Sequence, residues 1–566
     1  MRAQLIAFAR LLAALTLLTG CAAAPTAAPP APAAAPTAVA APTAPAATAA
    51  PAATPSPSPE PVAPWWNDAV FYEVFVRSFY DSDGDGVGDL PGLIEKLDYL
   101  NDGDPATGSD LGVTGIWLMP IAQSPSYHGY DVVDYKAIDD EYGTGEDFTR
   151  LIDEAHRRGI KVIVDLVVNH TSAQHPWFME SIDPASPKHD WYIWSAEPAG
   201  PNWHDVGKSE KYYGYFGGHM PDLNYDNPAV TEAMFDIVRF WLEEMHVDGF
   251  RLDAIKYIAE EGRTVEHAPA TFEWLEDFHK FHKGIDPDAF TVGEVWAETM
   301  IAEYYVPDKV DAVFEFSLAE AMLQSAQLGD RARVERAQTN VNKTYPPGQF
   351  ATFLANHDQN RTRSRMKAEG QAFVAASLQL LYPGVPFIYY GEEIGMKGEK
   401  PDEDIRRPMQ WTAEGGFTTG EPWRAYYDDL AERSVAGQES DRTSLLNHYR
   451  SLIGLRNTYP ALRTGSWQPV TAPKEQAAVY AFMRTLGEER FLVLINLGDE
   501  PVTDYQLSLE AAVGASAPAQ PVKAELVFGP ADAAGKIPAL QAGSLTDYRP
   551  VTTLPAYSTF VIRFAP

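Results

Sequence analysis

The stretch KVIVDLVVNH, residues 161–170, is an almost continuous run of apolar residues that ends in Asn169 and His170. A strand with one face in water alternates apolar and polar residues, whereas a strand buried on both faces is apolar nearly throughout. Flanking segments, TGEDFTRLIDEAHRRG before it and AVTEAMFDIVRFWLEEMH after it, carry apolar residues at helical spacing. The stretch therefore predicts a buried strand between helices, with polar groups at its carboxyl end.

Similar runs, rich in β-branched and aromatic residues, recur between residues 69 and 393, and helix-like segments separate most of them. The other predicted strands are 69–76, 112–120, 247–255, 290–296, 312–318, 351–358 and 385–393. Eight strands that alternate with helices predict an α/β fold, a (β/α)8 TIM barrel.

Two regions depart from this alternation. Residues 171–226 are rich in Trp, Tyr, Pro, His and Gly, and they are too many for a structureless loop, so they predict a subdomain inserted after strand 3. From residue 464 to 566, short runs such as AAVYAFMR and STFVIRFA follow one another without helices, which predicts a C-terminal antiparallel β-sandwich. The barrel then takes residues 65–170 and 227–463.

The N-terminal residues predict an export signal. Residues 1–20 contain two arginines and then the apolar run 11–18, which is too short to span a bilayer. The ending LTGC resembles a bacterial lipobox, and several acyl chains on Cys21 would anchor the protein stably. We therefore expect a bacterial lipoprotein, anchored to the cell membrane outside the cytoplasm, with Cys21 as its lipidation site. The alternative is an ordinary secretory signal with a chance cysteine.

Composition predicts a linker and limits the kinds of partner that the protein can bind. Residues 21–64 are mostly Ala, Pro and Thr, which predicts a disordered linker. The formal net charge is −34, from 78 acidic against 44 basic residues, which argues against nucleic acid or an anionic membrane surface as a partner. Contact with a membrane is expected only through the lipid anchor. The single cysteine excludes an intrachain disulfide framework, and nothing in the sequence indicates the oligomeric state.

Polar residues gather at the predicted carboxyl ends of strands, where barrel enzymes carry their catalytic groups. They are Asp165, Asn169, His170, Arg251, Asp253, Glu294, His357 and Asp358. A single Asp or His at such a position is more often a cap or a loop anchor. Three carboxylates at the same ends of three strands, Asp253, Glu294 and Asp358, point to catalysis instead.

Four short segments resemble the motifs of the α-amylase family, glycoside hydrolase family 13, in their usual order. They are DLVVNH (165–170), GFRLDAIKY (249–257), GEVW (293–296) and FLANHD (353–358). MPDLN, residues 220–224, resembles the family's fifth motif. The resemblance implies a glycosidase of the retaining type that cleaves α-1,4-glucosidic bonds in starch and maltooligosaccharides through a covalent glycosyl-enzyme intermediate.

The resemblance assigns roles by position. Asp253 corresponds to the nucleophile, Glu294 to the general acid/base, and Asp358 to the carboxylate that stabilises the transition state. A retaining glycosidase needs one carboxyl ionised to attack and one protonated to release the leaving oxygen. Arg251, two residues before Asp253, shares its face of the strand and would hold that carboxylate ionised. Glu294 must be kept protonated by apolar surroundings or by nearby negative charge.

The same resemblance implies the substrate contacts. His170 and His357 correspond to histidines that bind sugar hydroxyls, and Tyr130 in YHGYDVVDY corresponds to a sugar-stacking tyrosine with His128 beside it. Lys256 stands where α-amylases often carry a lysine on the leaving-group side.

Specificity within the family stays open. Ala254 follows the predicted nucleophile where relatives specific for α-1,6 bonds commonly carry Val, which favours α-1,4 bonds. MPDLN, DEDIRRPMQW (402–411) and an aspartate-rich loop resemble segments of the group between oligo-1,6-glucosidases and neopullulanases, and the predicted anchor fits a lipoprotein α-amylase of that group. Alternatives are an α-glucosidase or oligo-1,6-glucosidase and a glucanotransferase, because one intermediate can pass to water or to a sugar. A non-catalytic glucan-binding protein is less favoured, because all three carboxylates are present.

The aspartate-rich loop DSDGDGVGDL, residues 81–90, raises the question of calcium. An EF-hand loop needs a glutamate at its twelfth position, which is Gly92 here, and a helix before the loop, where this chain predicts a strand. Similarity to oligo-1,6-glucosidase relatives instead implies a structural Ca²⁺, and an empty solvated turn is the alternative. The implied ligands are the side chains of Asp81, Asp83, Asp85 and Asp89 and the carbonyl of Val87. Tyr257 replaces a histidine that helps many α-amylases bind a second calcium, which argues against that site.

Overall fold

The computed structural model of the 566-residue chain describes residues 63–260, 264–509, 522–530, 537–540 and 545–565. The predicted signal, Cys21 and all but the last two residues of the predicted linker lie outside the described residues. Among the described helices, none has the length and apolar character needed to cross a membrane.

The described chain contains a closed barrel of eight parallel strands, and their spatial order follows the chain until the last strand pairs with the first. The strands are β1 (Phe71–Val74), β2 (Gly115–Leu118), β5 (Lys161–Val167), β9 (Gly249–Asp253), β10 (Phe290–Gly293), β11 (Ala312–Phe314), β12 (Phe350–Thr352) and β13 (Val385–Tyr389). Each lies within one residue of, or inside, a predicted strand. The (β/α)8 barrel is therefore confirmed.

Helices connect the strands and cover the barrel. They are α1 (Leu90–Glu95), α2 (Leu97–Leu100), α3 (Gly145–Arg157), α5 (Pro228–Arg239), α6 (Pro269–Ile285), α7 (Thr299–Ala302), α8 (Phe316–Leu328), α9 (Ala332–Thr344), α10 (Thr362–Arg365), α11 (Glu369–Leu381), α12 (Asp402–Ile405), α13 (Val435–Gln438), α14 (Leu445–Thr458) and α15 (Pro460–Arg463). The shorter helical turns are η1 (Trp65–Asp68), η2 (Val76–Ser78), η3 (His189–Trp191), η4 (Phe240–Glu244), η5 (Ile255–Tyr257) and η6 (Glu303–Tyr305). Helix α3 shows why such segments start where they do, because Thr144 and Asp147 exchange hydrogen bonds in a capping box.

The barrel interior is a packed core rather than a channel. Inward-facing side chains from the strands form one apolar cluster, in which the rings of Phe71 and Phe387 stack with centroids 4.5 Å apart. A second and larger cluster lies between the strands and the helices and continues into the insert. Burial on both faces explains why the strands appear in the sequence as continuous apolar runs.

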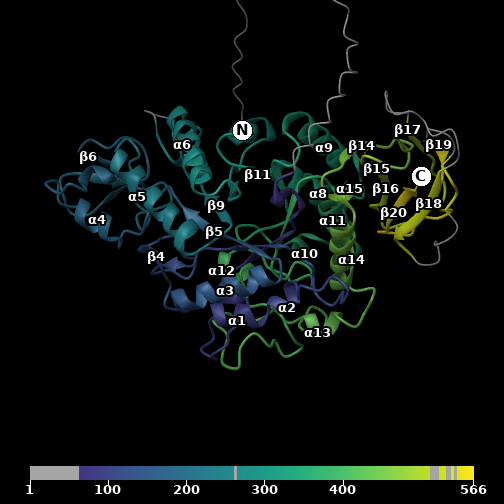
Figure 1. The fold of residues 1–566 in the computed structure, drawn as a ribbon, viewed down its shortest axis with the longest axis horizontal. Coiled ribbons are helices and arrows are strands. Elements are labelled where there is room, and N and C mark those ends of the chain that lie inside the picture. Colours follow the sequence, from purple (N-terminus) through teal and green to yellow (C-terminus); the bar gives the residue numbers. More distant parts are fainter. Residues whose placement is uncertain (1–62, 261–263, 510–521, 531–536, 541–544, 566) are drawn as a thin grey trace, which may run out of the picture. The chain divides into compact units, whose positions relative to one another are not determined.

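The two departures from the barrel pattern form separate groups of strands (Figure 1). Between β5 and α5, the insert contains α4 (Pro176–Ser181) and a three-stranded sheet of β6 (Trp194–Ser195), β8 (Lys211–Tyr213) and β7 (Trp203–Asp205). A small pair, β3 (Ala122–Gln123) and β4 (Asp134–Ile138), follows β2.

The C-terminal region is antiparallel, as predicted. One sheet has the order β14 (Ser466–Pro469), β15 (Val479–Leu486), β16 (Glu489–Asn496), β20 (Thr559–Ala565) and β18 (Lys523–Phe528), and a second pairs β17 (Leu507–Leu509) with β19 (Leu545–Tyr548). Side chains of both sheets share one apolar cluster, so the two sheets form a sandwich.

Several predicted strands extend beyond the observed ones, and one of them runs into an α-helix. The prediction of a strand over residues 312–318 is wrong beyond Phe314, because the chain turns into helix α8 at Phe316. The Glu315 carboxylate accepts a hydrogen bond from the Leu318 N–H at 3.3 Å and so caps the helix. The alternating pattern of FEFSL resembles a strand, but its charged residue is a helix cap.

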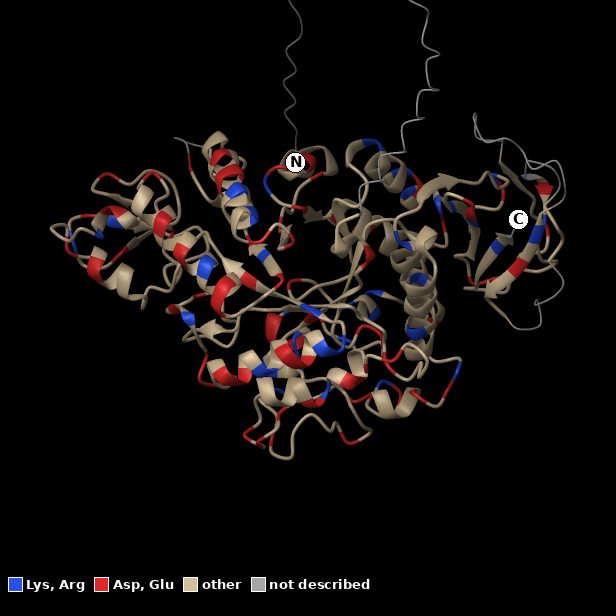
Figure 2. Ribbon diagram, viewed as in Figure 1, with Lys and Arg blue, Asp and Glu red and all other residues tan. Residues whose placement is uncertain are grey.

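Charges of both signs are interspersed along the described chain, with Asp and Glu more numerous than Lys and Arg (Figure 2).

Candidate active site

A pocket of about 760 Å³ opens where several barrel strands end. Its lining includes seven residues that the sequence analysis singled out, namely His128, Tyr130, His170, Asp253, Lys256, Glu294 and Asp358. The other two predicted residues, Arg251 and His357, do not line the pocket but are buried against the residues that do. The structure thus brings the whole predicted constellation together.

Arg251 contacts three carboxylates at once. Its Nη1 donates to Asp253 Oδ1 at 2.6 Å and to both oxygens of Asp165 at 2.9 Å, and its Nη2 donates to Glu294 Oε2 at 2.7 Å. Asp253 is the last residue of β9, and Arg251 precedes it by two, so both side chains lie on one face of that strand. Arg251 is 1% exposed, so a single buried cation forms hydrogen bonds to three acidic groups.

The environment sets the charge of the two nearest carboxyls. Burial raises the pKa of Asp253 to about 6, with contributions from the negative charges of Asp165 and Asp358, and Arg251 opposes this shift. Burial also raises the pKa of Glu294, and the negative charges of Asp253 and Asp358 raise it further. Arg251 therefore does not lower the pKa of Asp253 below its usual range, but Asp253 is still ionised at neutral pH.

The backbone reverses directly after Asp253. Ala254 has φ +50°, in the left-handed region that non-glycine residues rarely adopt, and its N–H donates to Glu294 Oε2 at 3.2 Å. This strained turn adds a second donor to the Glu294 oxygen that Arg251 also contacts.

Asp358 follows β12 and is held by different groups. Its backbone N–H donates to Asn356 Oδ1 at 3.0 Å, Arg406 Nη2 donates to its Oδ1 at 3.0 Å, and His357 Nε2 lies 3.2 Å from its Oδ2. Burial would raise the pKa of Asp358, but the charges of His357 and Arg406 hold it well below its usual range. Asp358 is therefore anionic throughout the working pH range.

Tyr130 connects the two groups of carboxylates. Its hydroxyl donates to Asp165 Oδ2 at 3.0 Å and lies 2.7 Å from His357 Nε2, while its ring stacks between those of His357 and His128. Burial lowers the pKa of His170 to about 3 and also lowers that of His128, so both are neutral at working pH.

Lys256 and Tyr257 shape the side that faces the insert. Lys256 Nζ donates to the Trp296 carbonyl and to Glu266 Oε2, each at 3.2 Å. The Tyr257 ring packs on Tyr215 of the insert with centroids 4.3 Å apart. An aromatic contact thus stands where the sequence analysis argued against a second calcium site.

Several residues of this site were missed by the sequence analysis. Arg406 contacts Asp358. The pocket lining also includes Arg406, Asp402, Lys400, Phe216, Met220 and Trp296. Glu73, in the middle of β1, contacts His357. A carboxylate inside the apolar run FYEVFV is an unusual signal that could have identified Glu73.

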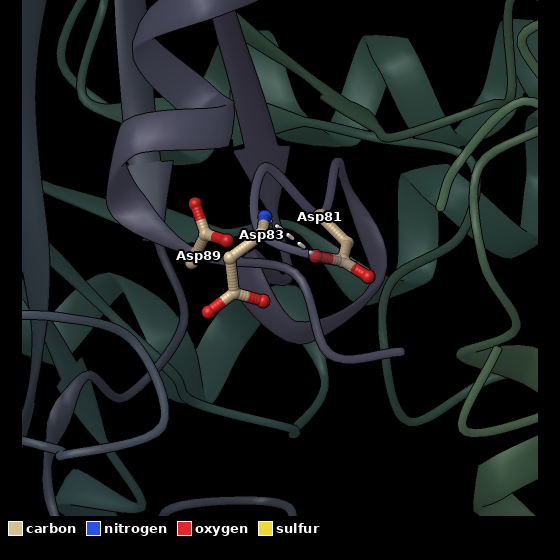
Figure 3. A group of neighbouring side chains, drawn as sticks. All are labelled: Asp81, Asp83 and Asp89. Atoms are coloured by element: carbon tan, nitrogen blue, oxygen red, sulfur yellow. Dashed lines mark hydrogen bonds between the residues drawn. The ribbon is translucent and has the colours of Figure 1, made fainter. Parts of the chain in front are cut away.

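The aspartate-rich loop follows β1 and η2, and in it one carboxylate oxygen from each of Asp81, Asp83 and Asp89 lies within 4.8 Å of the other two (Figure 3). Asp81 accepts hydrogen bonds from the N–H groups of Gly84 at 2.7 Å and Gly86 at 2.8 Å. These bonds fix the positions of the Asp81 oxygens within the loop.

The loop depends on a glycine and on a second segment. Gly86 has φ +96°, and a Cβ there would lie 2.1 Å from the Glu421 carbonyl oxygen, so the close approach requires glycine. Trp423 N–H donates to the Gly86 carbonyl at 2.9 Å. Asp85 is not one of the three grouped aspartates, and its carboxylate accepts the Val87 N–H at 2.8 Å.

Known proteins with similar sequences and structures agree with this geometry. A family model described as the catalytic domain of alpha amylase matches residues 73–465. Alpha-amylase 3 of Dictyoglomus thermophilum is 42% identical over 446 residues, which are 77% of this chain and 85% of that protein. Trehalose synthase/amylase TreS of Mycobacterium tuberculosis is 35% identical over 485 residues, 74% of this chain and 79% of that protein.

Among solved structures, the crystal structure of an alpha-amylase from H. orenii matches with a TM-score of 0.77 and 41% sequence identity, over 88% of this chain and 99% of that one. The family model and the relatives confirm the resemblance drawn from the motifs. The chain belongs to the α-amylase family of glycoside hydrolases, family 13, and is a glycosidase.

Proposed function

We propose that this glycosidase hydrolyses α-1,4-glucosidic bonds in starch and maltooligosaccharides with retention of configuration. Asp253 acts as the nucleophile, Glu294 as the general acid/base and Asp358 as the carboxylate that stabilises the transition state. The observation that carries the proposal is that Arg251 binds both Asp253 and Glu294 in one pocket, with Asp358 also lining it.

In the first step, Asp253 attacks the anomeric carbon while Glu294 gives its proton to the leaving oxygen. Asp253 is ionised for this because its pKa of about 6 lies below neutral pH. Glu294 keeps a proton more readily than an isolated glutamate because it is buried near two other carboxylates. The anionic Asp358 lies at the same pocket and stabilises the positive charge that develops on the sugar ring.

In the second step, Glu294, now ionised, takes a proton from a water molecule that attacks the glycosyl-enzyme ester and releases Asp253. Negative charge moves between Asp253 and Glu294 during the cycle, and Arg251 contacts both. The guanidinium therefore stabilises each charge state without moving.

The other pocket residues take binding roles in this proposal. His128, Tyr130 and His170 bind the sugar before the cleaved bond, His357 acts on the same sugar through Tyr130 and Asp358, and Lys256 binds on the leaving-group side. Lys256 is oriented for this by the Trp296 carbonyl.

The preference for α-1,4 bonds is supported by Ala254 and by similarity to two proteins named as alpha-amylases. A second candidate is transfer of the glycosyl group to a sugar, which the similarity to a trehalose synthase/amylase favours. Hydrolysis and transfer differ only in what attacks the intermediate.

Replacing the nucleophile tests the mechanism. We expect Asp253→Asn to fold normally, because Arg251 keeps Asp165 and Glu294 as partners, and to lose starch hydrolysis by at least about 10³-fold. The matched control is Asp311→Asn, which changes a buried aspartate that precedes β11 and bonds Thr291 outside the pocket. The control should keep its kcat. Retained hydrolysis in Asp253→Asn would remove this residue from the reaction.

A product profile tests the specificity. On soluble starch, maltotriose, pullulan and isomaltose, we expect short maltooligosaccharides from starch, a rapid fall in iodine staining, and little release from isomaltose. Glucose released only from chain ends would instead identify an α-glucosidase. Products longer than the substrate would identify a transferase.

We also propose that the aspartate-rich loop holds a structural Ca²⁺. Carboxylate oxygens are the ligands that Ca²⁺ prefers, and Asp81, Asp83 and Asp89 present three of them close together. The side chain of Asp85 and the carbonyl of Val87 complete the set expected from the sequence. Without a cation, these carboxylates repel one another.

The loop is positioned to brace the pocket. Trp423, which bonds Gly86, packs against Tyr127 with ring centroids 5.6 Å apart, and Tyr127 accepts a hydrogen bond from Arg406 at 3.4 Å. Arg406 in turn bonds Asp358. The calcium would therefore stabilise one wall of the active site.

Chelation tests the calcium proposal. EGTA should lower the melting temperature, and excess Ca²⁺ should restore it, because the metal binds the folded state. In Asp83→Asn the shift should be reduced, whereas Asp104→Asn, a change at an exposed aspartate of another turn, should leave it intact. An unchanged melting temperature, with no metal found by elemental analysis, contradicts the site.

Finally, we propose that Cys21 carries lipid and anchors the enzyme outside the cytoplasm. The basis is the LTGC sequence after a short apolar run. The native protein should enter the detergent phase on partition, and Cys21→Ser should stay in the aqueous phase. Equal partition of the two would exclude the anchor.

A further inference from the structure

Glu73 is a buried carboxylate in β1 that does not line the pocket. It is 2% exposed, and its Oε1 lies 2.6 Å from His357 Nδ1 and accepts the backbone N–H of His357 at 3.4 Å. Burying a carboxylate costs free energy unless it is paired. The pairing with His357 therefore explains how Glu73 is tolerated in the barrel wall. The same pairing acts on the protonation state of His357.

Both ring nitrogens of His357 face oxygen atoms. While Nδ1 faces Glu73, Nε2 lies 2.7 Å from the Tyr130 hydroxyl and 3.2 Å from Asp358 Oδ2. The single hydroxyl proton of Tyr130 goes to Asp165, so the oxygen presents lone pairs to His357. A neutral imidazole carries a single N–H. Its other nitrogen would then direct a lone pair at the lone pairs of Glu73, or of Tyr130 and Asp358, which is unfavourable. The doubly protonated ring satisfies every contact.

The groups that face His357 come from several strands. They are Glu73 of β1, Tyr130 after β3, Asp165 of β5, Glu294 after β10, Asp358 of the same loop as His357 and Arg406 after α12, and Arg251 of β9 contacts Tyr130 and Asp165 behind them. Burial lowers the pKa of His357, but Asp358 and then Glu73 outweigh burial and raise it to about 9.

We propose that Glu73 is a positioning residue that holds His357 as an imidazolium, with its Nε2–H directed to Tyr130 and Asp358, two residues that line the pocket. Glu73 itself touches no substrate. When the ring loses a proton, the Glu73 carboxylate retains the one on Nδ1, so Nε2 changes from a donor to an acceptor. Tyr130 and Asp358, which line the pocket, then lose this donor. The inference rests on the proposed glucan-binding role of the pocket.

The direct test is an NMR titration of the imidazole groups in the protein labelled at histidine, with the His357 signal identified by its loss in His357→Gln. In the native chain, His357 should stay cationic up to a pH of about 9. In Glu73→Gln, which keeps the shape and removes the charge, the midpoint should fall by about one pH unit or more. Glu73→Asp, which keeps the charge, should restore a midpoint near the native one.

The matched control is Glu315→Gln, which removes another buried carboxylate of the barrel that bonds Thr299 and Tyr345. It should leave the His357 titration unchanged. A neutral His357 at pH 7.5 in the native chain would overturn the proposal even if Glu73→Gln did not fold. An unchanged midpoint in a folded Glu73→Gln would overturn it as well.

Binding measurements link the titration to function. In a Glu294→Gln background, which prevents turnover, the Kd for maltotetraose should rise about fourfold between pH 6 and 8.5 when Glu73→Gln is added and the midpoint falls to about 8. It should change little when Glu73→Asp is added. An equal pH dependence in both would contradict the positioning role. A native enzyme that neither binds nor cleaves glucans would refute the proposed function, while the NMR titration would still decide the role of Glu73.

Discussion

The guanidinium of Arg251 is the constraint on which this active site depends. Asp165, Asp253 and Glu294 converge on it, and their side chains are 0%, 10% and 16% exposed. Three such carboxylates without a cation would repel one another and would take up protons. A planar guanidinium offers five donors in a fixed arrangement, whereas a lysine offers a single point charge. The proposed first step needs Asp253 ionised and Glu294 protonated, and the second step reverses these charges. A cation shared by both carboxyls permits this movement of charge.

The barrel places the partners of Arg251 through strand register. Asp165 of β5 pairs directly with Arg251 of β9, and the backbone N–H of Glu294 continues the ladder by donating to the Leu252 carbonyl at 3.0 Å. A shift of one residue in either strand would turn these side chains to the opposite face. The packed rings inside the barrel fix the register. The apolar core and the charged site are therefore parts of one arrangement.

The sequence predicted features that depend on neighbouring residues, and it did not predict contacts between residues far apart in the chain. Continuous apolar runs predicted all eight barrel strands, and the motifs predicted the residues that meet in the pocket. The alternation of FEFSL misled because Glu315 caps a helix rather than facing solvent from a strand. Glu73 lies 284 residues from His357 and Arg406 lies 48 from Asp358, so neither contact is visible before the barrel closes.

In the loop of residues 81–90, the spacing of the aspartates likewise predicted that their side chains converge. It did not predict that only three of the four would do so. The loop packs against residues 417–423, and within it Asp85 accepts the Val87 N–H while Asp81, Asp83 and Asp89 come together.

The central claim is that Asp253 forms a covalent bond to the sugar, so that the substrate's configuration is inverted twice. The most direct measurement is proton NMR of the anomeric signals in the first minutes of maltooligosaccharide hydrolysis, before mutarotation. The account predicts that the α-anomer appears first and the β-anomer only later. Initial release of the β-anomer would show a single displacement by water and would contradict the account.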